Sequence, residues 1–202
     1  IMKKYTILFL FLLLSGCATI SKNLEVDVNN DFPHNEVQKI AIVTFETSLK
    51  KEGTTGLIFK SSSVEKVKTV FTGIMARELR RWERFAILEG KTLEEELESK
   101  NFSEEDFLLT ENYSRLGRSI GVDAIVVGEV ERYGYSYIKM PYFRPIVAHA
   151  FVVSFKVKCI DVITNETIWT ADIKGTSKED GERVMASVLI AEAINTLKAK
   201  LY

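Results

Sequence analysis

The sequence predicts an α+β protein that resembles a three-layer α/β sandwich, with helices flanking a mixed sheet. In the first half of the chain, apolar runs of strand length alternate with segments of helical periodicity, which is typical of strands connected by helices. Near the C-terminus, two alternating runs are joined by Thr164-Asn165, which predicts an antiparallel hairpin before a last helix. The expected order is therefore strand, helix, short strand, helix, three strands and helix.

The folded part is predicted to span residues 37–202. It begins with a buried strand over 37–45, because Ile40–Val43 are continuous apolar residues. The next segment, 50–60, contains two glycines around a short apolar stretch, and we expect it to be mobile with an apolar tip.

A helix is predicted over 62–82, opened by a capping box of Ser62 and Glu65. Its apolar residues repeat at helical spacing: Val64, Val67, Phe71, Ile74, Met75, Leu79 and Trp82. Four arginines gather towards its C-terminal end: Arg77, Arg80, Arg81 and Arg84. They indicate either solvated cations that complement the helix dipole or a patch for an anionic partner.

The remaining elements are predicted as a short strand at 85–88, helices that start near 92 and 103, strands at 122–137, 151–162 and 167–175, and an amphipathic helix over 180–201. Gly121 is expected to end the second of these helical stretches. The last helix is expected to bury Val184, Val188, Ala191, Ile194, Leu197 and Leu201.

Aromatic residues are dense where the strand over 122–137 ends. They are Tyr133, Tyr135, Tyr137, Tyr142 and Phe143. Two interpretations stay open: an aromatic rim over the core, or a surface that binds a partner, since tyrosine offers a large contact area at small entropic cost.

Composition excludes several functional classes. The formal charge is −1, so nothing attracts nucleic acid. His34 and His149 stand in no metal-ligand or catalytic pattern, and no phosphate-binding loop is present. Cys159 continues an apolar strand face and is expected to be buried. We expect no enzyme, cofactor or metal site.

The N-terminus resembles a bacterial lipoprotein signal. Lys3 and Lys4 precede a short apolar run that ends in Leu14-Ser15-Gly16-Cys17. By this resemblance residues 1–16 are a signal peptide, and Cys17 carries acyl chains such as palmitate that hold it to a membrane. The residue after Cys17 is not aspartate, which by the same resemblance indicates the outer membrane.

Residues 17–36 are then expected to form the lipidated Cys17 and a polar tether. Leu24, Val26 and Val28 alternate with polar residues, so a short strand within this segment is the alternative.

Two stretches carry a further resemblance: Gly121-Val122-Asp123-Ala124-Ile125-Val126-Val127-Gly128-Glu129-Val130 and Asp161-Val162-Ile163-Thr164-Asn165-Glu166-Thr167-Ile168-Trp169. They are similar to the periplasmic domain shared by CsgG, LpoB and the N-terminal domain of TolB. The resemblance implies a domain that faces the periplasm and binds an envelope protein, as an accessory or assembly factor; an LpoB-like activator of a peptidoglycan synthase is the most concrete version.

The alternative within the same resemblance is a CsgG-like oligomeric component of a secretion or transport complex. CsgG-type channels carry two long hairpin insertions, whereas only 133–150 and 175–179 stand at the matching positions. The second of these is too short for a membrane hairpin, which needs two strands of about ten residues. A lipid-tethered binding module is therefore preferred, and homo-oligomers remain an option.

Overall fold

The computed structural model describes residues 20–49, 53–54, 57–103, 105–106, 112–138 and 147–202. Its strands are β1 (Ser21–Val28), β2 (Lys39–Ile42), β3 (Glu46–Thr47), β4 (Gly53–Thr54), β5 (Leu57–Ser61), β6 (Ala86–Glu89), β7 (Ala124–Ile138), β8 (Val147–Asp161) and β9 (Thr167–Ser177). Its helices are the short 3-10 helix η1 (His34–Glu36) and the α-helices α2 (Val64–Arg81), α3 (Gly90–Glu98), α4 (Tyr113–Ile120) and α5 (Glu182–Leu201). The predicted α+β class is confirmed.

The strands form one mixed sheet with the order β1-β9-β8-β7-β2-β6. β1, β9, β8 and β7 are antiparallel neighbours, whereas β2 runs parallel to both β7 and β6. The shorter β3 and β5 pair with β7 beyond the end of β2, and β4 pairs with β5. The predicted hairpin of β8 and β9 is confirmed, as is the short strand expected at 85–88, which is β6.

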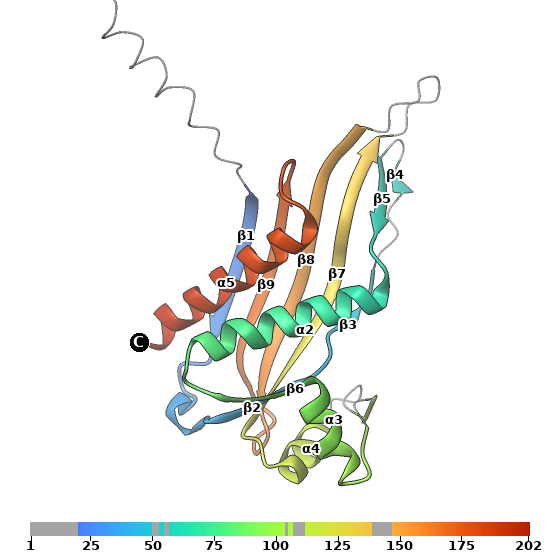
Figure 1. Cartoon of the computed structure of the whole chain (residues 1–202). Coiled ribbons are helices and arrows are strands. Elements are labelled where there is room, and N and C mark those ends of the chain that lie inside the picture. Colours follow the sequence, from blue (N-terminus) through green and yellow to red (C-terminus); the bar gives the residue numbers. More distant parts are fainter. Residues whose placement is uncertain (1–19, 50–52, 55–56, 104, 107–111, 139–146) are drawn as a thin grey trace, which may run out of the picture.

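The helices form layers on the sheet. α2 and α5 lie side by side across one face, as Figure 1 shows, and bury the larger core cluster against β7, β8 and β9. α3 and α4 pack at the end where β2 and β6 lie and enclose a second, smaller core cluster. The three-layer arrangement is therefore limited to that end of the sheet.

Phe71 of α2 is the centre of the larger core. Its ring centroid lies 5.9 Å from Phe45, 5.4 Å from Tyr133 and 4.9 Å from Phe155, and all four side chains are fully buried. Gly128 of β7 makes room for this cluster, because a Cβ atom there would stand 2.1 Å from the Phe45 ring. The aromatic core therefore depends on a residue without a side chain.

A β-bulge in β7 decides which of its side chains point inward. The register with β8 shifts between Val130 and Arg132, and an extra residue in a strand reverses the alternation beyond it. Before the shift Val126 and Val130 belong to the larger core, and after it Tyr133 does. The bulge therefore places the odd-numbered tyrosines on the helix-covered face.

Part of the segment expected to be a tether, Ser21–Val28, belongs to the sheet as β1. β1 pairs with β9 along its whole length, from Ser21 opposite Thr176 to Val28 opposite Trp169. Val26 is 3% exposed, and Leu24 and Val28 pack against the larger core. The alternating pattern was thus the correct signal, because three apolar side chains on one face are enough to hold an edge strand.

The segment before α2 contains strands that were not predicted. Leu57–Ser61 is β5, which pairs with β7 from Ile138 to Gly134, while residues 50–52 and 55–56 lie outside the described part of the chain. The helix begins one residue later than predicted, with Ser63 at its N-cap and no side-chain capping bond. Ser62 instead donates a hydrogen bond to the Glu182 carboxylate, 3.2 Å away, and so joins the starts of α2 and α5.

The start of the helical stretch expected from Ser103 is confirmed in the residues that the structure describes. Ser103 donates its backbone N–H to the Asp106 carboxylate at 2.8 Å, and residues 105–106 form a 3-10 turn. Residues 107–111 lie outside the described part of the chain, and α4 follows from Tyr113. It ends at Gly121 as predicted, where φ is +66° and a residue without Cβ is favoured.

α5 buries part of the predicted face, including Ile194 and Leu197, but is rotated so that Val184 is not buried. Its buried residues are Met185, Ala186, Leu189, Ile190, Ala193, Ile194 and Leu197, while Val184 is 53% exposed. The helix is apolar on most of its circumference, so periodicity alone did not fix the face. Contacts with β1, β9 and α2 decide it.

Candidate interaction surfaces

The aromatic residues predicted at the end of β7 fall into two groups. Tyr133 is 0% exposed and lies in the core against Phe71, so it does not offer the partner surface that was predicted for it. Its hydroxyl has no hydrogen-bond partner among the described residues. Burial, and next the Glu182 carboxylate, raise the pKa of Tyr133 to about 12.

Tyr135 and Tyr137 continue the same strand face beyond Tyr133 and are only half-buried. Their ring centroids are 5.9 Å apart, and Tyr135 meets Phe151 of β8 edge to face at 6.3 Å. These three rings form what we call the hairpin-end cluster. Tyr142 and Phe143, the other two predicted residues, lie outside the described part of the chain, as does Cys17.

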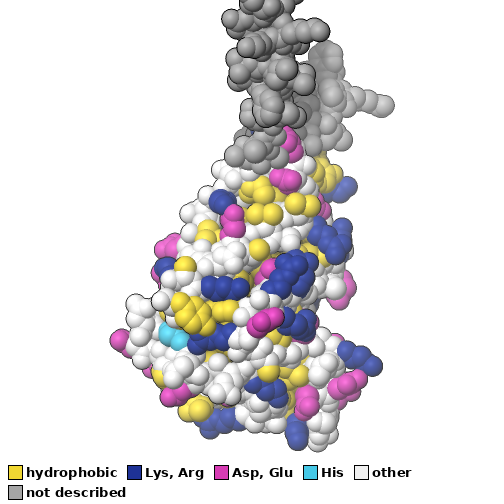
Figure 2. All heavy atoms as spheres, turned by 60° about the vertical axis from the view of Figure 1, so that its left-hand side comes forward, with side chains coloured by type: hydrophobic (Ala, Val, Ile, Leu, Met, Phe, Trp, Pro, Cys, Tyr) yellow, Lys and Arg dark blue, Asp and Glu magenta, His cyan; other side chains and the backbone are white. Residues whose placement is uncertain are grey.

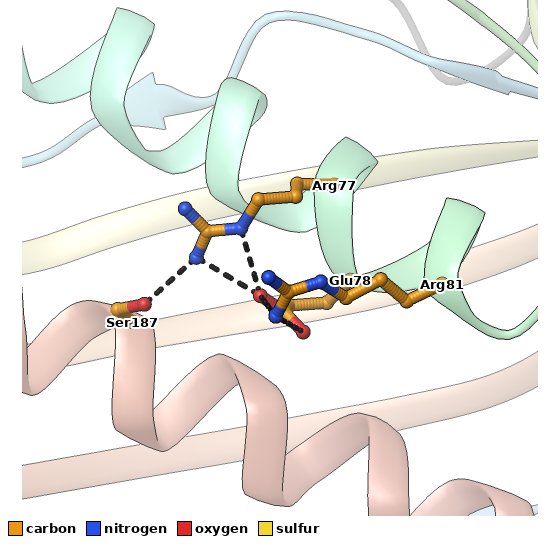
Figure 3. Close-up of polar contacts among 4 residues, drawn as sticks. All are labelled: Arg77, Glu78, Arg81 and Ser187. Atoms are coloured by element: carbon orange, nitrogen blue, oxygen red, sulfur yellow. Dashed lines mark hydrogen bonds and ion pairs between the residues drawn. The ribbon is translucent and has the colours of Figure 1, made fainter.

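A second surface is organised by Glu78 of α2, which is 7% exposed. Its Oε1 accepts hydrogen bonds from Arg77 Nε at 2.9 Å and from Arg81 Nη1 at 3.1 Å. Arg77 Nη2 also donates to Ser187 Oγ of α5 at 2.8 Å. Figure 3 shows the two guanidinium groups converging on this one carboxylate between the helices.

One carboxylate cannot neutralise two guanidinium groups, so positive charge remains on this surface. The side chains of Arg77 and Arg81 are 46% and 66% exposed. Arg80 forms an ion pair with Glu89 but is still 51% exposed. Figure 2 shows Lys and Arg side chains gathered across the middle of this face. We call Arg77, Arg80, Arg81 and Arg84 with Lys198 the basic surface.

Aromatic rings border the basic surface near the C-terminal end of α2. The Arg84 guanidinium stands 5.6 Å from the Trp82 ring centroid, 5.3 Å from that of Phe85 and 5.7 Å from that of Tyr202. Lys198 lies 5.6 Å from the Trp82 ring. Arg84 also donates to the His34 carbonyl at 2.6 Å. These contacts hold its cation in place beside the half-buried rings of Trp82 and Phe85 and the exposed ring of Tyr202. Arginine together with aromatic residues is frequent in protein interfaces.

A wide crevice of about 1130 Å³ lies on the other side of α2, outside the carboxyl ends of β2 and β6. Its lining holds seven glutamates against three lysines: Glu46, Glu65, Glu89, Glu94, Glu98, Glu105 and Glu129 with Lys68, Lys156 and Lys158. A hydrogen bond to Glu131 raises the pKa of Lys156, so that ammonium is charged. The crevice is therefore acidic, in contrast to the basic surface.

Cys159 is 1% exposed within the larger core, so its predicted burial is confirmed. Burial, and next the Asp161 carboxylate, raise the pKa of its thiol far above the ordinary range. Within the described ranges, no group of three His, Cys, Asp or Glu residues is placed to hold a metal ion. None of the described helices is both long and apolar enough to cross a bilayer.

The sequence reasoning found the arginines but not their arrangement. It left solvated capping and an anion-binding patch open for Arg77, Arg80, Arg81 and Arg84, and gave no role to Glu78. A glutamate one residue after an arginine on a helix carries no signal of burial by itself. Only the packing of α5 against α2 brings Ser187 to Arg77 and covers the carboxylate.

Comparison with solved structures shows which proteins share the fold. PelC dodecamers from Paraburkholderia phytofirmans align at TM-scores of 0.57 and 0.53, with 15% and 18% identity, over 86% of this chain and 96% and 95% of theirs. The lipoprotein GNA1162 from Neisseria meningitidis aligns at TM-score 0.51 and 15% identity, over 80% of this chain and 99% of that one. No protein-family model and no curated protein matches the sequence.

LpoB, which was expected to share the fold, aligns less well. The C-terminal domain of LpoB from Salmonella enterica aligns at TM-score 0.41 and 14% identity, over 69% of this chain and 82% of that domain. The chain therefore has the fold of PelC and GNA1162, and its place in a superfamily with CsgG, LpoB and TolB stays a proposal.

Proposed function

We propose that this protein is a lipid-anchored lipoprotein of the bacterial cell envelope whose folded domain acts by binding another envelope protein, without catalytic chemistry of its own. In this proposal Cys17 carries the acyl chains, and the domain faces the periplasm from the outer membrane. The protein serves as an accessory or assembly factor. LpoB-like activation of a peptidoglycan synthase is its most concrete form.

The observation that carries the proposal is the basic surface, on which two exposed arginines share the single buried carboxylate of Glu78. The exposed guanidinium groups of Arg77, Arg80 and Arg81 are suited to an acidic protein surface, because arginine binds carboxylates bidentately. The half-buried Arg84 adds a cation beside the rings of Trp82 and Tyr202. The lipoprotein signal that ends at Cys17 and the fold shared with a lipoprotein, GNA1162, support a location in the cell envelope.

The docking test compares two double variants that each remove two positive charges. Arg80→Ala with Arg81→Ala alters the basic surface, and Glu78 keeps Arg77 as a partner. Arg115→Ala with Arg118→Ala alters α4 on another side of the molecule and is the matched control. The soluble domain of each is used to capture proteins from an envelope extract, and thermal unfolding is measured in parallel.

We expect the control to retain the specific partners that the unmodified domain captures and the Arg80/Arg81 variant to lose them at an unchanged thermal midpoint. Equal capture by both variants would remove the basic surface from the proposal. For the LpoB-like form, the captured proteins include a peptidoglycan synthase, and the unmodified domain raises its rate of glycan synthesis.

The anchoring part has its own test. Replacement of Cys17 by Ser is expected to move the protein from the membrane fraction to the soluble periplasmic fraction of a bacterium that processes lipoproteins. If the Ser variant stays in the membrane fraction, acyl chains on Cys17 are not what holds it there.

A second candidate function is an oligomeric component of a secretion or transport complex. The observation in its favour is that one chain carries both a basic surface and an acidic crevice: Arg77 contacts α5, while Arg80 is paired with Glu89, which lines the crevice. Patches of opposite charge on one chain favour a head-to-tail contact, which closes into a ring when the rotation permits. The fold is also that of the PelC dodecamers.

Light scattering of the soluble domain separates the two candidates. A monomer favours the tethered accessory protein. A ring of many copies that dissociates at high salt favours the oligomeric component, since contacts between exposed charges are screened by salt.

A further inference from the structure

The start of β1 and the hairpin-end cluster lie at the same end of the molecule. Ser21 is opposite Thr176, Thr176 is opposite Val152, and Val152 is opposite Gly134. Gly134 therefore marks the level of the sheet at which the chain enters β1. Figure 1 shows β1 beginning at the end of the sheet towards which β7 runs.

The hairpin of β7 and β8 projects beyond that level. From Val152 back to Val147, which is paired with Ile138, β8 runs five residues further. At about 3.3 Å per residue this is a projection of about 16 Å. Tyr135, Tyr137 and Phe151 lie on this projecting part and are half-buried.

The chain between Cys17 and Ser21 is short. Only Ala18, Thr19 and Ile20 intervene, so even a fully extended chain holds Ser21 within about 14 Å of Cys17. The hairpin projects about as far as this linker can reach. A domain anchored at Cys17 with its strands upright therefore cannot keep the hairpin end clear of the bilayer surface.

We propose that the projecting end of β7 and β8 docks on the membrane that holds Cys17, with Tyr135 and Tyr137 in the headgroup region. This inference rests on the proposed anchor at Cys17. Tyrosine is enriched at membrane–water interfaces because its ring is apolar and its hydroxyl polar. Lys60 of β5, opposite Tyr135, is exposed and supplies a cation for lipid phosphates.

The other orientation, in which the edge strand β1 lies against the bilayer, is less favourable. Lys22, Glu25 and Asp27 are exposed along that edge, and Lys22 forms an ion pair with Glu192 at 2.5 Å. Bringing these charges to the bilayer surface would remove water from them at a cost. The hairpin end presents rings instead.

The experiment attaches the anchor chemically. The chain from Cys17 onward is coupled through the Cys17 thiol to a maleimide-headgroup lipid in phosphatidylcholine vesicles, while Cys159 is buried and does not react. Tyr137→Trp places a fluorophore at the hairpin end. Tyr202→Trp makes the same substitution at a residue 87% exposed at the other end of α5. Because the Tyr202 ring lies 6.5 Å from that of Trp82, each variant and the unmodified chain are measured with and without brominated lipid.

Brominated phosphatidylcholine is expected to quench the emission added by Tyr137→Trp and to leave that added by Tyr202→Trp unchanged. Equal quenching of the two, or greater quenching of Tyr202→Trp, would overturn the proposal. If Tyr137→Trp does not fold, hydrogen exchange on the unmodified sequence replaces it: amides of 135–138 and 147–151 should exchange more slowly on vesicles than free in solution, and unchanged rates would overturn the proposal. Because the anchor is imposed, these outcomes are independent of whether cells lipidate Cys17, which the Cys17→Ser fractionation tests.

Discussion

The ring of Phe71 meets the ring of Tyr133 edge to face, with their centroids 5.4 Å apart and their planes at 75°. This contact ties α2 to β7 just where β7 leaves the cover of the helices. It also places a phenol hydroxyl in the core with no hydrogen-bond partner among the described residues.

Removal of that hydroxyl is predicted to be harmless to stability. A buried hydroxyl without a partner loses its hydration on folding and gains nothing in return. Tyr133→Phe should therefore leave the free energy of unfolding unchanged or raise it by up to about 1 kcal/mol. Denaturant titration at neutral pH measures this, and a loss of more than about 1 kcal/mol would indicate an unseen partner of the hydroxyl.

The same tyrosine predicts an alkaline pH dependence. Its pKa is about 12 in the folded protein against 10.0 ordinarily, so between these values the folded state holds more protons and stability falls as pH rises. At pH 11 the loss is about 1 kcal/mol. The free energy of unfolding of Tyr133→Phe, relative to that of the unmodified protein, should therefore rise between about pH 9.5 and about pH 11, a range that brackets the ordinary pKa of tyrosine. If the two proteins lose stability in parallel over this range, Tyr133 does not have the raised pKa.

Gly128→Ala tests the space beside Phe45. The added methyl group would stand 2.1 Å from that ring, so the core must shift at a cost of about 1–3 kcal/mol. Gly73→Ala is the matched control, because its Cβ meets nothing within 4 Å and alanine favours helix α2 by about 1 kcal/mol. Thermal unfolding should therefore move in opposite directions for the two variants, and a shared direction would contradict the packing described.

Val26→Ala tests whether β1 is part of the fold. Val26 is 3% exposed, and loss of two buried methyl groups should cost about 2 kcal/mol. Glu25→Ala, at the exposed neighbouring position, should change stability little. If both variants unfold at the same denaturant concentration as the unmodified protein, residues 21–28 act as a tether after all.

How much of this could be predicted depends on the kind of signal. The strands over 122–137 and 151–162 and the helix that became α2 have long, clear periodicity, and the structure confirms them with small changes at their ends. For Tyr133 the sequence left both an aromatic rim over the core and a partner surface open, because a bulge cannot be recognised in the sequence yet reverses the alternation after Val130. The buried face of α5 was predicted only in part, at Ile194 and Leu197, because apolar residues surround the helix.

The candidate surfaces divide in the same way. Tyr135 and Tyr137 were predicted from their density in the sequence, and the structure leaves them half-buried at the hairpin end. The buried carboxylate of Glu78 depends on a contact between α2 and α5 that are more than one hundred residues apart in sequence. No local pattern reports such a contact.

The thiol of Cys159 should be unreactive in the folded protein. Burial raises the pKa of its thiol, and the thiolate is the reactive form. A Cys17→Ser chain should not react with an aromatic disulfide reagent while it is folded. After denaturant is added, one thiol per chain, that of Cys159, should react. Rapid reaction without denaturant would mean that the strand pair β8–β9 opens readily.

The central claim is that Cys17 is the lipidated first residue of an envelope protein. It is tested most directly by the intact mass of the N-terminal peptide isolated from the membrane fraction of cells that express the full sequence. The account predicts a peptide that begins at Cys17 and carries a diacylglycerol group on its sulfur. A peptide that begins elsewhere, or one with an unmodified Cys17 thiol, would contradict it.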